Sequence, residues 1–241
     1  QNNDEFTSKL SYLCNARVIW GGDKTINSIR NHKIQERTVE LSFADRYSFC
    51  IMNTKKIMKL NNLEIDNLVH NFYNDTYAVD QNACTSPHLI VWIGKNKKKI
   101  EDKFWKKLYE LAKLKYNLQP FSSIEKFADT CKYIINKDNI KSIKNFDNLI
   151  HKIEIKRLDS DNHLMRGKWG LFFEFYSMSL NNLKNIINNK YQTLTYFGIK
   201  KEDLKELLIK NNLKGVDRIV PVGQSLNISL KWDGYNVVTS L

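Results

Sequence analysis

The chain has 241 residues, of which 42% are hydrophobic and 12% aromatic. This composition provides a sizeable core for one large or two small domains and excludes a disordered chain. The chain has 38 Lys and Arg residues against 26 Asp and Glu, which gives a net charge of +12. This excess of positive charge either solvates the surface or attracts an anionic ligand such as a phosphate-bearing cofactor. A basic nucleic-acid-binding domain is a rival interpretation of this charge, but no basic-aromatic module supports it.

Cysteine usage and the terminal residues narrow the class of protein further. The four cysteines stand far apart, at positions 14, 50, 84 and 131, and fit neither a zinc pattern nor a dense disulfide framework, so we expect free thiols, no metal site and a cytoplasmic protein. No apolar run reaches the roughly 18 residues of a membrane span. Residues 1–5 lack a signal-peptide pattern and an initiator Met, so we expect a fragment that begins inside a longer protein.

The amino-terminal part is predicted to hold a strand–helix–strand unit and one further strand. Its elements are a helix over residues 4–13, a strand over 16–20, a helix over 23–31 and strands over 37–43 and 47–52. Gly21 and Gly22 stop the first strand, which we expect to be buried. Asp23 is the expected N-cap of the second helix, and Ile26 and Ile29 mark its inner face.

The rest of the chain continues the alternation of helices and strands. The predicted helices cover residues 61–79, 100–112, 124–135, 180–190 and 201–211, and the predicted strands cover residues 88–93, 150–158, 169–175, 191–197, 218–220 and 228–230. Leu63, Leu68 and Phe72 mark the inner face of the first of these helices, and Gly215 closes the last. Without an internal repeat or a clear linker, this pattern predicts an α/β fold.

Residues 80–87 form a polar turn that carries one thiol, Cys84, directly before the strand over 88–93. Pro87 and the residue before it disfavour helix, so the thiol lies on a turn where a substrate can reach it. Cysteine is the side chain best suited to attack a thioester or an aldehyde, provided that it is activated. A buried or idle thiol is the alternative. His70 and His88 are nearby in the sequence, but each is better explained as structural or exposed than as an activating base.

Three other features contain polar or reactive groups. The remaining cysteines, at positions 14, 50 and 131, lie in apolar surroundings and are expected in the core. The Gly21–Gly22 turn joins a strand to a helix, which allows backbone and a helix N-terminus to approach a phosphate, although a plain tight turn is the alternative. Near the carboxyl terminus, Arg218 and Asp233 are predicted either to form a structural ion pair or to contact a ligand.

Taken together, three segments make the chain resemble the acyl-CoA reductase (LuxC) family of the aldehyde dehydrogenase superfamily. They are residues 18–23, residues 80–87, and residues 215–223 with 232–235. The resemblance implies an α/β fold with an aldehyde-dehydrogenase-like catalytic domain and the last strand–helix–strand part of a nucleotide-binding domain. Residues 1–50 are then the C-terminal part of a dinucleotide-binding domain whose remainder is missing, and residues 51–241 are the catalytic domain with its C-terminal strands.

The resemblance also implies a reaction, the NADPH-dependent reduction of a fatty acyl-CoA to an aldehyde. Cys84 is the implied nucleophile, which forms an acyl-cysteine, and Gly21 and Gly22 are implied to lie near the cofactor. The implied partners are the acyl-CoA substrate and either an acyl-transferring enzyme or a second copy of the chain. A reductase of the acyl-phosphate type and a non-catalytic scaffold of the same fold are the alternatives.

One segment departs from the hydrolytic aldehyde dehydrogenases, which carry a glutamate that activates water. By its spacing from Arg46, the glutamate's place falls on Ser42, and Glu40 lies two residues away, which displaces it by about 6–7 Å along a strand. A reductase has a physical reason to lack this base, because its acyl-thioester has to survive until hydride arrives.

Overall fold

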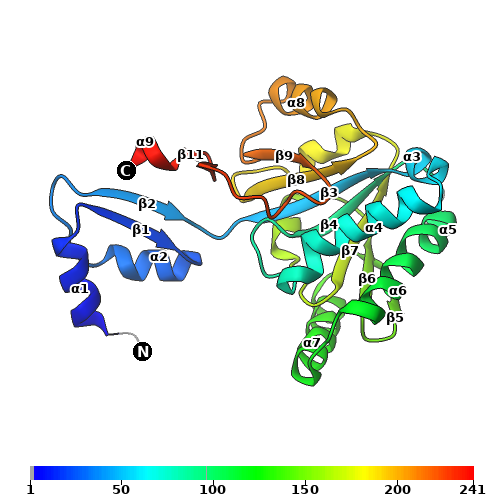
Figure 1. The fold of residues 1–241 in the computed structure, drawn as a ribbon, viewed down its shortest axis with the longest axis horizontal. Coiled ribbons are helices and arrows are strands. Elements are labelled where there is room, and N and C mark those ends of the chain that lie inside the picture. The colour runs from blue at the N-terminus through cyan, green and yellow to red at the C-terminus, as the bar shows by residue number, and fades with distance from the viewer. Residues whose placement is uncertain (1–2, 96) are drawn as a thin grey trace. The chain divides into compact units, whose positions relative to one another are not determined.

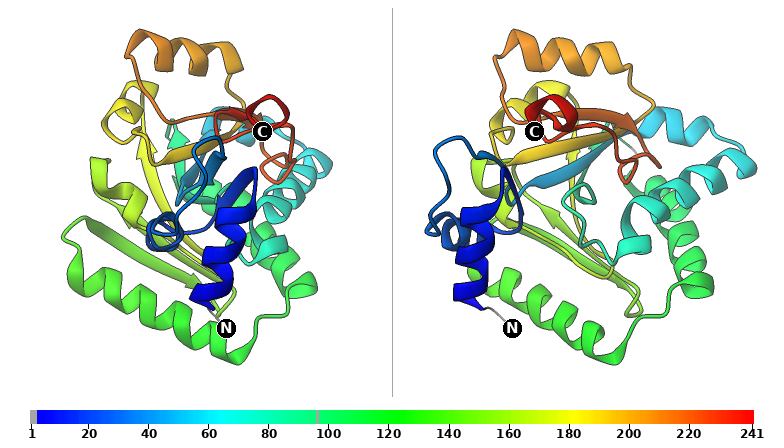
Figure 2. Two further views of the ribbon diagram at one scale, coloured as in Figure 1. Left: turned by 90° about the vertical axis from the view of Figure 1, so that its left-hand side faces the viewer. Right: turned by 60° about the vertical axis from the view of Figure 1, so that its left-hand side comes forward.

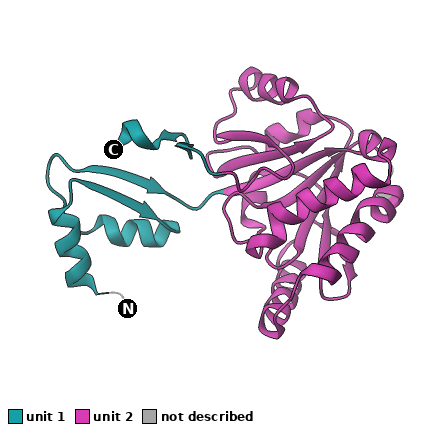
Figure 3. Ribbon diagram, viewed as in Figure 1, with its two compact units in different colours: residues 1–46, 228–241 teal, residues 47–227 magenta. Residues whose placement is uncertain are grey.

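The computed structural model describes residues 3–95 and 97–241, and Figures 1 and 2 trace them in three views. The chain divides into two compact units (Figure 3). Unit 1 combines Gln1–Arg46 with Ile228–Leu241, and unit 2 is Tyr47–Asn227. The division therefore falls four residues before the boundary expected after residue 50, and the last strands belong to unit 1 rather than to the larger unit.

Unit 1 is built on two parallel strands joined by a helix. Strand β1 (Ala16–Trp20) pairs in parallel with β2 (Val39–Phe43), α2 (Asp23–Arg30) connects them, and α1 (Asp4–Leu13) precedes them. This confirms the predicted strand–helix–strand order. The first strand is not fully buried, however, because its side chains alternate between the two faces. Val18 and Trp20 are 50% and 61% exposed.

The carboxyl-terminal segment completes unit 1. Strands β10 (Lys231–Trp232) and β11 (Tyr235–Asn236) form an antiparallel hairpin, which is followed by α9 (Val237–Ser240). Trp232 is buried with Leu41 and Phe43 of β2 in a small apolar cluster. Asp233 accepts a hydrogen bond of 2.8 Å from Arg46.

Unit 2 contains a seven-stranded sheet whose strand order is β5-β6-β7-β4-β3-β8-β9. Neighbouring strands are parallel except for the antiparallel pair β5–β6. The strands are β3 (Tyr47–Asn53), β4 (Pro87–Ile93), β5 (Ile140–Phe146), β6 (Ile150–Ile155), β7 (Leu171–Ser177), β8 (Tyr191–Phe197) and β9 (Arg218–Pro221). The α/β class is therefore confirmed, with β4 and β3 in the middle of the sheet.

Helices cover both faces of this sheet (Figures 1 and 2). They are α3 (Thr54–Lys59), α4 (Asn62–Thr76), α5 (Lys97–Ile100), α6 (Lys106–Lys115), α7 (Pro120–Asn136) and α8 (Lys201–Lys210), with short 3-10 segments η1 (Tyr77–Val79), η3 (Ser160–Leu164) and η4 (Leu180–Asn185) and a π-helical turn η2 (Glu101–Trp105). Phe72 of α4 packs with Ile90 on one face, and Leu204 of α8 packs with Val91 on the other. Because side chains of a strand alternate, the central strands are buried on both sides.

Several local predictions are corrected by the structure. Gly22, not Asp23, is the N-cap of α2, so Asp23 is its first helical residue. Leu63 is 71% exposed, whereas Leu68 and Phe72 are buried as expected. Within the predicted helix over 180–190, the structure has the short η4, and the predicted strand over 228–230 gives way to β10. Helix α8 ends at Lys210, and the left-handed residue that follows it is Asn212 (φ 48°) rather than Gly215.

Within the described residues, no helix has the length and apolar character to cross a bilayer. Nowhere in residues 3–95 and 97–241 do three or more His, Cys, Asp or Glu side chains lie together as ligands of a metal ion would.

Candidate functional site

The turn that carries Cys84 is fixed by a buried glutamine. Helix α4 passes into η1, and Asp80 and Gln81 then adopt left-handed backbone conformations (φ 55° and 59°) that reverse the chain. The Gln81 side chain is 1% exposed. Its amide nitrogen donates to the carbonyls of Pro87 (3.2 Å) and Leu171 (3.1 Å), and its oxygen accepts from the backbone of Gly170 (3.1 Å). The turn is thereby tied to β4 and β7.

Cys84 lies at the amino-terminal end of the central strands. Its carbonyl accepts a hydrogen bond of 2.6 Å from Ser48 Oγ at the start of β3, and the same Oγ accepts from the backbone of Thr193 in β8 (3.1 Å). Thr85 and Ser86, which follow, are buried, whereas Cys84 itself is partly exposed. The backbone of Cys84 is therefore held by Ser48 of β3, which β8 holds in turn, while the residue remains partly open to solvent.

Arg218, at the start of β9, binds the loop that follows this strand. Its guanidinium donates to the main-chain carbonyls of Ser225 (2.9 Å), Asn227 (2.8 Å) and Gln224 (3.3 Å). Burial lowers the pKa of Arg218, and electrostatic attraction to Cys84 and to Asp75 opposes that shift. The sequence analysis offered either an ion pair with Asp233 or a ligand contact for Arg218, and both stay predictions.

Asp75 holds the loop that Arg218 binds. This carboxylate, on the last turn of α4, is 1% exposed and accepts from the backbone of Gly223 (2.7 Å) and Ser225 (2.9 Å). Burial raises its pKa, although both backbone bonds oppose the rise. Sequence analysis missed Asp75. The sequence feature that could have identified it is an acidic residue three positions after Phe72, on the apolar face of an amphipathic helix.

The two histidines predicted to be structural or exposed have partners other than the thiol. His88 is buried, its Nδ1 lies 3.0 Å from the carbonyl oxygen of Gly167, and its ring stacks on Tyr47. Burial, together with the charge of Arg166, lowers the pKa of His88 to about 3, so it is neutral near pH 7. His70 lies on α4, where its Nε2 is 2.8 Å from the Nζ of Lys115.

The other cysteines differ from one another. Cys50 is fully buried in β3, as predicted, and burial raises the pKa of its thiol far above the ordinary value, which makes it unreactive. Cys14 and Cys131 are only partly buried, so their predicted place in the core is wrong.

The predicted cofactor residues lie at the β1–α2 turn of unit 1. The N–H of Gly21 donates to Phe43 in β2 (3.2 Å), and the carbonyl of Gly22 accepts from Ile26 (3.0 Å). Neither glycine has a positive φ, and a Cβ added to Gly22 meets only the Asp45 carboxylate at the ordinary contact distance of 3.8 Å. The fold alone therefore does not require glycine at position 22. The start of a helix can bind a phosphate group, but the negative charge of the Asp45 carboxylate opposes its approach at this position.

Glu40 and Ser42, at the place of the water-activating glutamate, are both bound to arginines. Glu40 accepts from Arg17 Nε (2.8 Å) and Arg30 Nε (2.7 Å), and Ser42 Oγ accepts from Arg30 (3.0 Å). Burial raises the pKa of Glu40, but the bonds from Arg30 and Arg17 outweigh it and hold the pKa below its usual value. Glu40 is thus a weak base held in an ion pair.

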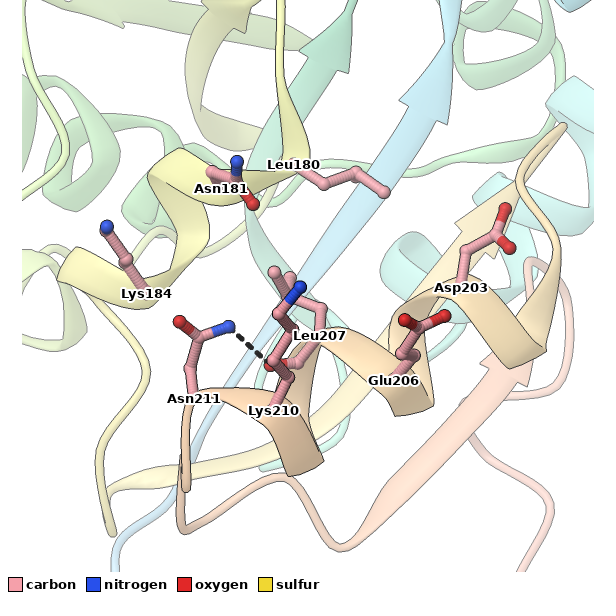
Figure 4. Close-up of a pocket in the computed structure, with 8 residues that line it drawn as sticks. All are labelled: Leu180, Asn181, Lys184, Asp203, Glu206, Leu207, Lys210 and Asn211. Atoms are coloured by element: carbon pink, nitrogen blue, oxygen red, sulfur yellow. Dashed lines mark hydrogen bonds between the residues drawn. The ribbon is translucent and has the colours of Figure 1, made fainter.

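A separate groove of about 350 Å³ lies between η4 and α8 (Figure 4). Acidic side chains of Asp203 and Glu206 and basic side chains of Lys184 and Lys210 line it, around the apolar Leu207. None of its lining residues is a cysteine, a histidine or a glycine. It therefore lacks the chemistry predicted for the acyl site.

Comparison with known proteins gives one family and one fold. The model of the acyl-CoA reductase (LuxC) family matches residues 1–149, a span that includes Gly21, Gly22 and Cys84. A search of curated proteins finds no match.

Solved structures that resemble the chain include aldehyde dehydrogenases. The NAD-dependent benzaldehyde dehydrogenase of Corynebacterium glutamicum is 8% identical over 91% of this chain and 48% of its own, with a TM-score of 0.55. Aldehyde dehydrogenase 21 of Physcomitrella patens, in complex with the reaction product succinate, is 10% identical over 94% and 48%, with a TM-score of 0.61. A putative methylmalonate-semialdehyde dehydrogenase of Sinorhizobium meliloti complexed with NAD is 9% identical over 97% and 52%, with a TM-score of 0.58. These likenesses show the aldehyde dehydrogenase fold, and the chain spans about half the length of each of these proteins.

Proposed function

The chain belongs to the acyl-CoA reductase (LuxC) family, and on that premise we propose that it reduces a fatty acyl-CoA to the aldehyde through an acyl-cysteine at Cys84. The observation that carries the proposal is the position of Cys84. It is a partly exposed thiol on a turn held by Gln81 and Ser48, at the end of the central strands of an aldehyde dehydrogenase fold.

The first chemical step is acyl transfer to the protein. The Cys84 thiolate attacks the carbonyl carbon of the thioester, a bond forms between that carbon and Sγ, and the bond to the sulfur of CoA breaks, so that CoA leaves as its thiolate. Negative charge develops on the carbonyl oxygen during this exchange. We propose backbone N–H groups of the turn over residues 80–87 as its hydrogen-bond donors.

Gly21 and Gly22 are the proposed cofactor residues. Because Gly22 has no Cβ, a phosphate can approach the backbone at the start of α2. NADPH, when bound, would supply the hydride that converts the acyl group to an aldehyde, and release of the aldehyde returns Cys84 to the free thiol. The exposed faces of Val18 and Trp20 support the assignment of residues 1–50 to part of a larger dinucleotide-binding domain, with residues 51–241 as the catalytic domain.

The absence of glutamate at position 42 supports a reductase rather than a hydrolytic dehydrogenase. Ser42 has no carboxylate, and the Glu40 carboxylate is held by two arginines. An ion-paired carboxylate with a lowered pKa is a poor acceptor for a proton from water. Positions 40 and 42 therefore offer no free carboxylate of the kind that activates water in hydrolytic aldehyde dehydrogenases.

The family and the exposed apolar surface of helix α7 suggest what this chain associates with. We propose that an acyl-transferring enzyme or a second copy of the chain associates with it. Helix α7 supports this, because Phe121, Ile124 and Ile135 are 68%, 69% and 80% exposed on it. The four free cysteines support a reducing, cytoplasmic setting.

Acylation is tested directly by intact-protein mass spectrometry. The protein is mixed with a long-chain acyl-CoA without NADPH, and we expect one acyl group to be added and one CoA to be released. Cys84→Ala should abolish the mass gain, whereas Cys131→Ala, which changes another partly buried thiol, should retain it. Acylation of the Cys84→Ala protein at the normal rate would remove the assignment. A mass gain from acyl phosphate but not from acyl-CoA would instead identify an acyl-phosphate reductase.

A further inference from the structure

The pairing of the central strands is irregular at one point, around Ser48 of β3. On one side β8 contains one extra residue between the partners of Tyr47 and Phe49, and on the other side β4 contains one between the partners of Ser48 and Phe49. Such irregularities change the direction of side chains and are frequent beside active sites. Ser48 is fully buried here, between the two strands that lie on either side of β3.

The Ser48 hydroxyl has a single proton, and its two hydrogen bonds decide which atom receives it. The main-chain N–H of Thr193 can only donate, so Ser48 Oγ accepts from it (3.1 Å). The carbonyl of Cys84 can only accept, so the hydroxyl proton is directed to its oxygen (2.6 Å). Strand β8 therefore holds the hydroxyl, and the hydroxyl holds the carbonyl of Cys84 in one direction.

The carbonyl that Ser48 binds belongs to the peptide group between Cys84 and Thr85. In a trans peptide the N–H points opposite to the C=O, so the bond that fixes the Cys84 carbonyl also fixes the direction of the Thr85 N–H. Thr85 is 2% exposed, and within residues 3–95 and 97–241 no atom accepts a hydrogen bond from its N–H. Main-chain N–H groups of buried residues are nearly always bonded, so this one is available to a ligand.

A donor at this place suits the attack of a thiolate on a carbonyl carbon. When Sγ forms a bond to that carbon, an electron pair of the C=O moves to the oxygen, and the pair returns when the leaving group departs. The side chain of Cys84 and the N–H of Thr85 are separated by only a few covalent bonds, so one small acyl group can meet both. Hydrogen bonds in a chain polarise one another, so the bond from Ser48 also makes the Thr85 N–H a stronger donor.

We propose that Ser48 is a positioning residue for acylation, which directs the Thr85 N–H at the oxygen where negative charge develops. This rests on the proposed function for the role of Cys84 as the nucleophile. Ser48 acts through a peptide group and not on the ionisation of the thiol. Its loss should therefore slow the reaction of Cys84 with a carbonyl electrophile and spare the reaction with an electrophile that forms no oxyanion.

Two reagents separate this role from an effect on the thiol itself. p-Nitrophenyl acetate acetylates Cys84 through an oxyanion and releases p-nitrophenolate, whereas iodoacetamide alkylates it at a saturated carbon. Both rates are measured at Cys84 by peptide mass spectrometry at one pH. Removal of an oxyanion donor costs roughly 10²–10³ in rate, and Ser48→Ala only misdirects the donor, so we expect acetylation to slow by about tenfold or more and alkylation to change by less than about twofold.

Ser177→Ala is the matched control. Ser177, at the carboxyl end of β7, is also buried, and its hydroxyl likewise donates to a main-chain carbonyl (2.7 Å) and accepts from a main-chain N–H (3.2 Å), both of Ser179. Its loss should leave the ratio of acetylation to alkylation unchanged. Ser48→Cys keeps the size of the side chain and a weak S–H donor, so its ratio should lie between those of Ser48→Ala and the unsubstituted protein.

The ratio of the two rates decides the outcome. A ratio in Ser48→Ala equal to that in Ser177→Ala, even where both rates fall together, would overturn the role of Ser48. Should Ser48→Ala fail to fold, the same comparison is made with Ser48→Cys, and an unchanged ratio there would overturn it too. Failure of the proposed function would be seen separately, as acetylation of Cys84 by p-nitrophenyl acetate without acylation by acyl-CoA.

Discussion

The buried amide of Gln81 is expected to set the stability of the turn that presents Cys84. Gln81→Met keeps the length of the side chain and removes its three hydrogen bonds, to Pro87, Leu171 and Gly170. At a net contribution of about 0.5–1.5 kcal/mol for each bond, the free energy of unfolding should fall by roughly 2–4 kcal/mol. That is less than the roughly 5–15 kcal/mol by which a typical protein is stable, so the variant should remain folded.

Urea unfolding followed by circular dichroism measures this loss as a lower midpoint with an unchanged slope. The rate of acyl transfer from acyl-CoA should fall as well, because the thiol is no longer held in one geometry. Asn82→Met is the matched control: it makes a similar substitution at the next residue, which is exposed, and should change stability by less than about 0.5 kcal/mol. A loss below about 1 kcal/mol for Gln81→Met, or equal losses in both variants, would show that the amide does not hold the turn.

Three further predictions concern ionisable side chains. Glu174→Ala should destabilise the protein by roughly 3–5 kcal/mol in urea unfolding, because Glu174 accepts from buried Lys152 at 2.7 Å and its loss leaves a buried ammonium without its nearest partner. Lys126 is almost fully buried, and burial lowers its pKa from 10.5 to about 7. Between those values the unfolded chain binds more protons, so stability should rise with pH from about 7 towards 10.5, and Lys126→Met should remove that rise in melting temperatures measured across this range. Glu40 has a pKa held below 4.5 in the folded state, so its contribution to stability is present above pH 4.5 and should be lost as the pH falls below that value. Glu40→Gln should reduce this loss of stability at acid pH, measured as melting temperature against pH. An unchanged acid dependence in Glu40→Gln would contradict the role of its pairing with Arg17.

The sequence predicted those parts of the fold whose pattern is local. The order of β1, α2 and β2 could be predicted because apolar runs end at glycines. Strand β4 could be predicted because a continuous apolar run follows Pro87. Strand β5 was missed because Ile140–Phe146 contains two lysines and an asparagine. Its exposed side chains reflect its place at the edge of the sheet, where a strand depends on pairing with β6 more than on burial.

The candidate site was only partly predictable for a similar reason. Cys84 stands out in the sequence because a turn, a proline and a strand follow one another around it. Gln81 and Asp75 do not, because their partners lie about 90 and 150 residues away, and only the closed sheet brings them together. Three main-chain carbonyls within ten residues bind Arg218, and charge alone does not predict such neutral partners.

An acyl-cysteine that waits for hydride has to survive in water. A general base next to it would take a proton from water and so promote its hydrolysis. Ser42, at the place that the resemblance assigns to the water-activating glutamate, has a hydroxyl rather than a carboxylate and is a much weaker base. If this reasoning holds, Ser42→Glu should increase hydrolysis of the acyl-cysteine, measured as loss of the acyl mass in the absence of NADPH, and an unchanged rate of loss would contradict it.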